Sequence, residues 1–455
     1  MENSFTVLLL AMTLLTALAF VISEYDILNP VCIVMFLMTV SVFLATTTIN
    51  RWHLYMSAEA SLLIITSMIC FAIGGFWADW RIKRNLGAQP IEKENCIFYI
   101  TTGKIILLSV CILGLGYFQY QEFYAASRAL GNTSGPFDFS SMIKAIRPSI
   151  ENETFKFSRW SSYRLVIAKT GMFCSIFCFF MNLIGANAIK WQRNVKYLLP
   201  VVAFIPFVAA NTGRELLLTV MLFSLLTGTI IYQIKCGFSV QSRMRTLGFF
   251  CLCSGTFFLL FLLLGMLSGK VSIGGRPPYE ILAHYMGLSM PAFSAFWDQT
   301  FVESPYIGST TLSDIYKKLG VLGIELPAVR GFLAFVHFND ISTNVYTMMA
   351  RYIKDFGVIG MYLVMAFIAM TYVAFYDYVR LVSKWYFSVA FYGMIPMTLF
   401  FSMNDDRFFT TLLSTTTIYD FAALYFVYKL LVTKKNCGIE NKKENRAITV
   451  DGNTD

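Results

Sequence analysis

The chain has 455 residues, of which 56% are hydrophobic and only 14% are charged, whereas about a quarter of the residues in ordinary soluble domains are charged. The formal net charge is +9, yet the basic residues lie mainly in short loops between apolar runs and in the carboxyl-terminal tail. This composition excludes a soluble enzyme and disfavours a nucleic-acid partner. It predicts an all-α polytopic integral membrane protein.

Apolar runs follow one another along the chain, and most reach the roughly 20 residues that a helix needs to cross the hydrocarbon. A β-barrel would instead show short alternating strands. We therefore predict about eleven transmembrane helices. The runs cover residues 5–22, 27–49, 57–78, 97–120, 164–187, 197–210, 216–234, 246–267, 356–376, 385–402 and 408–432.

The short basic loops give the orientation of these helices. Lys and Arg gather at 79–95 and 190–196, which places both loops at the cytoplasmic face by the positive-inside rule. The predicted organisation is helices 1–8 within 1–267 with a periplasmic loop at about 122–163, a large periplasmic loop at 268–355, helices 9–11 within 356–432, and a cytoplasmic tail at 433–455.

The run 197–210 is short and contains Pro200 and Pro206, and the sequence NTGRE follows it. This break predicts that Arg214 and Glu215 lie slightly below the outer surface, surrounded by protein. A buried arginine requires an anion. The partner is either a local carboxylate such as Glu215, or a phosphate held by two hydrogen bonds, which a lysine cannot reproduce.

The loop 268–355 carries the other candidate residues. In GGRPPYE the glycines allow a ligand to approach the backbone near Arg276 and Tyr279, although an exposed turn would have the same sequence. His284 and His337 are candidate bases because imidazole titrates near neutral pH, or they are simply solvated.

The sequence STNVYTMMARYIKDFG predicts a helix capped by Ser342 or Thr343 that enters the next span. Polar residues at helical spacing then form a stripe that faces a wet cavity. The alternative for its last two members is an exposed ion pair of small energy. The stripe comprises Asn344, Thr347, Arg351 and Asp355.

Asp405 and Asp406 lie in a predicted outer loop, where they either bind a divalent cation or cap a helix. Because no His or Glu accompanies them, we predict no metal site. Lys169 is predicted to extend its amine toward the membrane surface, and Asp420 is either a buried structural group or a cavity residue. Several loop aromatics either stack on sugars or form an interfacial helix: Tyr279, Tyr285, Phe293, Phe296 and Trp297.

This layout resembles the bacterial O-antigen polymerases of the Wzy type, which join oligosaccharide repeat units. NTGR is similar to that family's segment of small residues followed by an arginine. NVYT with DFGVIG is similar to its re-entry into the membrane after a large loop. The resemblance in layout covers most of the chain.

The resemblance implies transfer of a growing glycan from one undecaprenyl diphosphate carrier to the sugar of another lipid-linked repeat unit. The reaction would occur at the periplasmic face of the bacterial inner membrane, in lipopolysaccharide biosynthesis, without nucleotide sugar or cofactor. The implied partners are the undecaprenyl-diphosphate-linked oligosaccharide, membrane lipids, and the flippase and chain-length regulator of the same pathway. The family's essential arginines correspond to Arg214 and, less directly, to Arg276.

Displacement of a lipid diphosphate requires cations where negative charge develops, and the acceptor hydroxyl requires a proton acceptor. His337, Glu215 and Asp355 are the candidate bases. The predicted catalytic residues are Arg214, Arg276, His337 and Arg351, and the predicted substrate-binding residues are Glu215, Asn344, Tyr346, Asp355 and Tyr279.

Two other functions fit parts of the sequence. A ligase that attaches O-antigen to lipid A core would share the fold and the chemistry and differ in its acceptor. A lipid-linked oligosaccharide flippase would be a transporter with short outer loops and charges along a central cavity. The long loop 268–355 disfavours the flippase.

Overall fold

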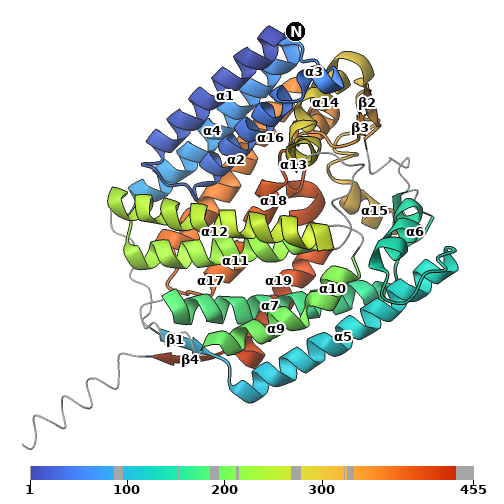
Figure 1. The fold of residues 1–455 in the computed structure, drawn as a ribbon. Coiled ribbons are helices and arrows are strands. Elements are labelled where there is room, and N and C mark those ends of the chain that lie inside the picture. Colours follow the sequence, from blue (N-terminus) through green and yellow to red (C-terminus); the bar gives the residue numbers. More distant parts are fainter. Residues whose placement is uncertain are drawn as a thin grey trace, which may run out of the picture. The chain divides into compact units, whose positions relative to one another are not determined.

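The computed structural model describes residues 2–86, 96–151, 154–184, 194–211, 215–267, 278–321, 323–324, 333–339 and 341–436. Helices make up most of this part of the chain, together with two short pairs of antiparallel strands (Figure 1). The chain divides into two compact units whose segments alternate along the sequence. Unit 1 comprises Met1–Pro90, Ser272–Val382 and Ile395–Ile418, and unit 2 comprises Ile91–Val271, Ser383–Met394 and Tyr419–Asp455.

Six helices among the described residues are long and apolar enough to cross a membrane. Shorter apolar helices cover Pro30–Thr46, Val195–Ala209 and Ser388–Phe400. The expectation of a helical, multi-pass membrane protein is confirmed at this level, while the count of about eleven spans stays a prediction. The six helices are Ser4–Ile22, Ala58–Leu86, Thr102–Ala129, Arg159–Ile184, Glu215–Cys236 and Met349–Val382.

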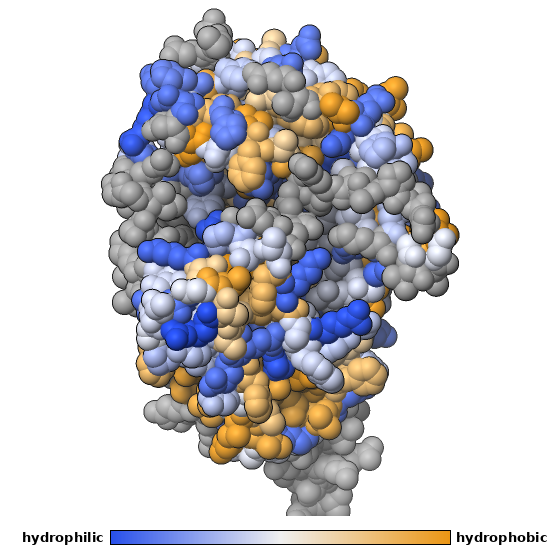
Figure 2. All heavy atoms as spheres, turned by 90° about the vertical axis from the view of Figure 1, so that its right-hand side faces the viewer, coloured by the Kyte–Doolittle hydropathy of each residue, from blue (hydrophilic) through white to orange (hydrophobic). Residues whose placement is uncertain are grey.

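The surface agrees with this assignment. Large apolar side chains stand exposed on the long helices, among them Leu10, Leu107 and Leu363. Figure 2 shows hydrophobic residues gathered in broad patches on one face. Extended apolar patches are rare on soluble monomers, so lipid is the environment that suits this surface.

Unit 1 is built on long helices that lie side by side (Figure 1). Helix α1 (Glu2–Ile22) contacts α2 (Pro30–Thr46) and α4 (Ala58–Leu86), and α16 (Met349–Asp377) packs along α4. Helix α2 begins at Pro30 because Asn29 Oδ1 accepts a hydrogen bond from Val31 N at 2.9 Å, and proline is well suited to the first turn.

Two glycines shape the pairing of α4 with α16. A Cβ at Gly74 of α4 would overlap the backbone of Ala366 in α16, so glycine is required for this close approach. Gly357 interrupts α16 with φ 68° and ψ −176°, a conformation open essentially to glycine alone. The interruption lies two residues after Asp355.

Short elements complete unit 1. Strands β2 (Val336–Phe338) and β3 (Ile341–Thr343) pair antiparallel, with His337 opposite Ser342. The helices are α3 (Ile49–Trp52), α13 (Pro278–Leu282), η2 (Ala283–Gly287), α14 (Ser289–Ala295), η3 (Phe296–Thr300), α15 (Ser313–Val321), η4 (Tyr378–Val382), α18 (Pro396–Phe400) and η5 (Phe408–Leu412).

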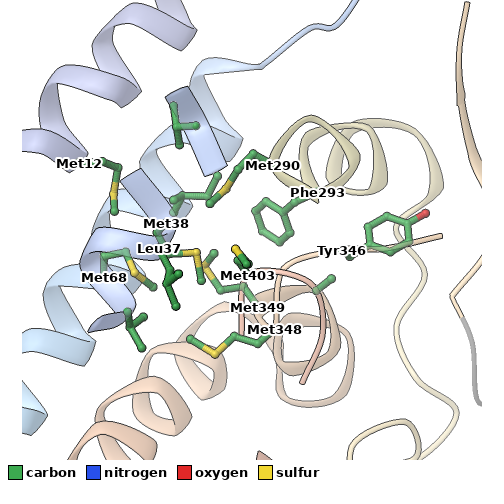
Figure 3. Close-up of a cluster of buried hydrophobic side chains, with 14 of the residues drawn as sticks. Met12, Leu37, Met38, Met68, Met290, Phe293, Tyr346, Met348, Met349 and Met403 are labelled. Carbon is green, nitrogen blue, oxygen red and sulfur yellow. The ribbon is translucent and has the colours of Figure 1, made fainter. Parts of the chain in front are cut away.

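The core of unit 1 is rich in methionine. Met12, Met38, Met68 and Met349 come from four different helices, and Figure 3 shows their side chains gathered in one cluster. Methionine is unbranched and fills irregular gaps, which suits helices that cross at several angles. Met290 of α14 joins this core, so part of the predicted loop 268–355 is packed against the helices.

Unit 2 contains the remaining helices, and the predicted break after residue 197 is present in it. Pro200 and Pro206 lie in the first turns of two short helices, α9 (Leu199–Ala203) and α10 (Ile205–Ala209). The other elements are β1 (Cys96–Tyr99), which pairs with β4 (Thr433–Asn436), α5 (Thr102–Ala129), α6 (Phe139–Glu151), α7 (Arg159–Ile184), η1 (Val195–Leu198), α11 (Glu215–Cys236), α12 (Val240–Leu267), α17 (Ser388–Met394) and most of α19 (Thr415–Leu431).

Candidate functional site

Charged and hydroxyl side chains collect around the first turns of α16, in unit 1. We name this group the α16 polar cluster. Arg351 and Asp355 of α16 are only 5% and 6% exposed. Buried charges of this kind must be paired or hydrogen-bonded. The cluster comprises Ser304, Thr310, Thr311, Arg351, Tyr352, Asp355, Asp405 and Asp406.

Arg351 binds the carboxylate of Asp405 by two hydrogen bonds, from the Nε and Nη2 edge of its guanidinium. Nε donates to Asp405 Oδ1 at 2.6 Å and Nη2 donates to Oδ2 at 3.0 Å. Nη1 donates to the carbonyl oxygen of Thr310 at 3.3 Å. Because Asp405 remains 33% exposed at its side chain, a buried arginine here orients a carboxylate that ligands can reach.

Asp355 holds the segment 304–311 against α16. Its carboxylate accepts hydrogen bonds from Thr310 N at 3.0 Å, from Thr311 N at 2.7 Å and from Thr311 Oγ1 at 2.8 Å. The hydroxyl of Ser304 also donates to it. The turn that presents these amides passes through Gly308, whose φ is 73°. Asp355 therefore acts as an anchor for this segment.

Asp406 differs from its neighbour because it is fully buried. Its Oδ1 accepts from Tyr352 Oη at 2.6 Å and from the backbone amides of Phe408 and Phe409 at 2.9 and 3.1 Å. Its Oδ2 has no hydrogen-bond partner among the described residues. Burial raises the pKa of the Asp406 carboxyl to about 6, against the lowering effect of the Tyr352 hydroxyl. A carboxyl with such a pKa can exchange a proton near neutral pH.

Several buried hydroxyl groups lie on the segments that build the cluster. The Oγ atoms concerned lack a hydrogen-bond partner within the described part of the chain. Together with three carboxylates around one guanidinium, they give the cluster an excess of acceptors and hydroxyls. This chemistry suits sugar hydroxyl groups better than a bare phosphate. The hydroxyls belong to Ser309, Thr310, Thr347 and Ser402.

The predicted arginines divide into two groups. Arg214 and Arg276 lie outside the described residues, so their predicted roles are untested. Arg351 is described, and its donors are taken by Asp405 and Thr310. Contact between Arg351 and negative charge on a leaving group is not tested by this structure and stays a prediction.

The other predicted site residues are scattered. Glu215 is exposed at the start of α11 in unit 2, whereas His337 is exposed on strand β2 in unit 1. Tyr279 is exposed, and its hydroxyl donates to Glu280 Oε1 at 3.2 Å. His284 is half-buried in η2. Among the described candidates, Arg351 and Asp355 are the two that the polar cluster includes.

The predicted helical stripe is only partly correct. Helix α16 begins at Met349 and not near Ser342, because residues 341–343 pair as strand β3. Asn344 and Thr347 thus precede the helix. Arg351 and Asp355 do share it, but the alternative of an exposed ion pair is wrong because both are buried.

Three aromatic predictions also change. Tyr346 is buried, and its hydroxyl donates to the carbonyl of Ala334 at 2.6 Å, so it supports the fold rather than a ligand. Phe293 and Phe296 are buried in the unit 1 core. Stacking of these two rings on a sugar is therefore excluded in this structure.

Buried ion pairs also occur at two other places in the described part of the chain. In unit 1 the guanidinium of Arg380 bonds to Asp26 and to Asp377, and Tyr376 Oη donates to Asp26 Oδ2 at 2.9 Å. In unit 2, Lys169 Nζ donates to Asp420 Oδ2 at 2.6 Å. The prediction that Lys169 extends its amine to the membrane surface is therefore wrong, because the amine pairs with Asp420. No group of three metal-binding side chains occurs among the described residues.

The fold defines a multi-pass integral membrane protein of helical architecture. Comparison with family models, with curated proteins and with solved structures finds no match. The function must therefore be argued from the residues themselves.

Proposed function

We propose that this protein is a membrane-embedded glycosyltransferase that polymerises lipid-linked O-antigen or similar repeat units at the periplasmic face of a bacterial inner membrane. The growing glycan would pass from undecaprenyl diphosphate to the next lipid-linked repeat. In this proposal about eleven helices span the membrane, with the segment 268–355 outside and the tail inside.

The observation that carries the proposal is the α16 polar cluster. An apolar chain that buries Arg351, Asp355 and Asp406 around one helix start bears the cost of dehydrating several charges. Such groups inside a membrane protein mark functional sites by default. The excess of carboxylates and hydroxyls is suited to the hydroxyl groups of an acceptor sugar.

The reaction assigns a role to two of the three carboxylates. The acceptor hydroxyl oxygen attacks the anomeric carbon of the donor sugar, and the bond from that carbon to the diphosphate oxygen breaks with its electron pair on the leaving group. The hydroxyl proton passes to Asp406, whose pKa of about 6 suits a general base at neutral pH. Because Asp406 is fully buried, this step requires the acceptor to displace the side chains that cover its Oδ2. Asp405, held by Arg351, orients the acceptor.

The diphosphate requires cations that the polar cluster does not offer. Arg214 and Arg276 are proposed for this role, as the family resemblance implies. A planar guanidinium binds two phosphate oxygens at once and stabilises the charge that develops on the leaving group. In this proposal the arginines bind the diphosphate of the donor, and the carboxylates bind and deprotonate the acceptor.

Surface lipopolysaccharide from a deletion strain tests the proposal. Single repeats on the core, restored to long chains by the wild-type gene, support a polymerase. Absence of any repeat would point to a ligase or a flippase. Complementation with Asp406→Asn then tests the base. This change keeps Oδ1 for the amides of Phe408 and Phe409, so the variant should accumulate in the membrane yet leave single repeats.

A further inference from the structure

The end of α4 carries a surface formed by tryptophan and arginine, which we name the α4 Trp–Arg face. Trp77 and Trp80 are 45% and 54% exposed. The guanidinium carbon of Arg81 lies 5.2 Å from the ring centroid of Trp77, and that of Arg84 lies 5.2 Å from the ring centroid of Trp80. Each arginine therefore stacks on an indole one turn before it.

The spacing puts all four side chains on one side of the helix. Steps of three and four residues make neighbours on a helix surface, and such steps join 77 to 80 and 81, and both of these to 84. The two guanidinium groups are thus adjacent like charges. Within the described part of the chain, neither has a carboxylate partner, since their recorded contacts are the two rings.

A third basic residue in the same turn behaves differently. Lys83 Nζ donates to Asp79 Oδ2 at 2.8 Å, and Asp79 is buried. On a helical wheel Asp79 lies opposite Trp77 and Arg84, and Lys83 turns its amine toward Asp79. The charge of Lys83 is therefore matched by the carboxylate of Asp79, whereas Arg81 and Arg84 are exposed and stack on the two indole rings.

We propose that the α4 Trp–Arg face binds the headgroup of an anionic phospholipid in the leaflet that contains the end of α4. Indole side chains prefer the boundary between hydrocarbon and headgroups, so the exposed rings set the face at headgroup depth. The two guanidinium groups bind the phosphate oxygens, and in an anionic headgroup no ammonium group compensates the charge of that phosphate. The proposal does not depend on the glycosyltransferase function.

The adjacent like charges explain why a ligand is needed. Two arginines at three-residue spacing repel each other, although both also benefit from the negative end of the helix dipole. A phosphate group between them converts the repulsion into two attractive contacts. A zwitterionic headgroup gains less, because its ammonium group is repelled by the same arginines.

Native mass spectrometry of the full-length protein can measure this binding. Protein in detergent micelles is titrated with phosphatidylglycerol or with phosphatidylcholine of the same acyl chains. Each basic residue near an anionic surface contributes about fivefold in affinity, so Arg81→Gln/Arg84→Gln should weaken phosphatidylglycerol binding about 25-fold. The single variants Arg81→Gln and Arg84→Gln should each weaken it about fivefold, and they serve if the double variant does not fold.

Lys83→Gln is the matched control because it removes one positive charge from the same turn. It should change the affinity less than about twofold, since Lys83 faces Asp79. Trp77→Leu/Trp80→Leu should weaken binding without any change of charge. Equal losses in Lys83→Gln and Arg81→Gln, unchanged binding in the double arginine variant, or equal affinity for phosphatidylcholine would each overturn the proposal.

Discussion

Replacement of Asp355 by asparagine is expected to release the segment 304–311 from α16. The native carboxylate accepts from two backbone amides and two hydroxyl groups. Asparagine keeps one acceptor oxygen and turns an NH2 group toward the same donors. At least two of the bonds are therefore lost, and bonds to a charged acceptor contribute about 1.5–3 kcal/mol each. The free energy of local opening should fall by about 3 kcal/mol.

Hydrogen–deuterium exchange of the purified protein measures this opening directly. A decrease of about 3 kcal/mol corresponds to exchange about 100-fold faster at the amides of Thr310 and Thr311. Lys354→Gln is the control, because it alters the adjacent side chain while the carbonyl of Lys354 still accepts from Ser304 N at 3.0 Å. If Asp355→Asn leaves the exchange of this segment at the wild-type rate, the anchoring role of the carboxylate is refuted.

Three further changes test the cluster and the proposed chemistry. Arg351→Ala leaves Asp405 without its partner and should lower the free energy of unfolding by about 2 kcal/mol, less than the roughly 3–5 kcal/mol of a fully buried pair because Asp405 is partly exposed; thermal unfolding beside Arg351→Lys measures it, and equal stability of all three proteins contradicts the reasoning. Tyr352→Phe removes a donor that lowers the pKa of Asp406, so the rate of polymerisation, expected to rise with pH through about 6 in the wild type, should rise only at higher pH in the variant; an unchanged pH–rate profile excludes Asp406 as the base. Arg214→Ala and Arg214→Lys should both accumulate in the membrane yet leave single repeats on lipopolysaccharide gels, and normal chains from the lysine variant would exclude two-point phosphate binding.

The pKa of Asp406 also has a consequence for stability. The folded-state value of about 6 lies above the ordinary value of about 3.9, so the folded protein binds the proton more tightly than the unfolded chain. The contribution of Asp406 to stability is thus greatest below about pH 4 and declines as the pH rises through about 6. Asp406→Asn should remove this part of the pH dependence in thermal unfolding.

The helices of this protein are predictable from its sequence, because a long apolar segment in lipid must satisfy its backbone hydrogen bonds internally and a helix does so. The break around Pro200 and Pro206 was predictable for the same reason, since proline removes a backbone donor wherever it occurs. The start of α16 was not predictable. Residues 341–343 pair with residues 336–338 as a hairpin. A helix-capping pattern at Ser342 gives no information about this strand partner, which competes with helix formation.

The site shows the same division. Arg351 and Asp355 were identified because charges in an apolar segment are informative by themselves. The partners Ser304, Thr310 and Thr311 were missed, because ordinary hydroxyl residues in a loop carry no signal of the carboxylate that they bind. Helix capping was one of two interpretations of Asp406, and its Oδ1 does accept from the amides of Phe408 and Phe409 at the start of η5. Its complete burial depends on packing against Tyr352, which no spacing reveals.

The interruption at Gly357 separates α16 into two helical parts, before and after this residue, whose faces are not in register with each other. A continuous helix advances by a fixed angle at each residue, so a face defined at Arg351 and Asp355 would persist along its whole length. The extended conformation of Gly357 breaks that relation. The buried face of the turn that carries the polar cluster is therefore independent of the buried face of the long span that follows. A substitution that rotates one part need not rotate the other.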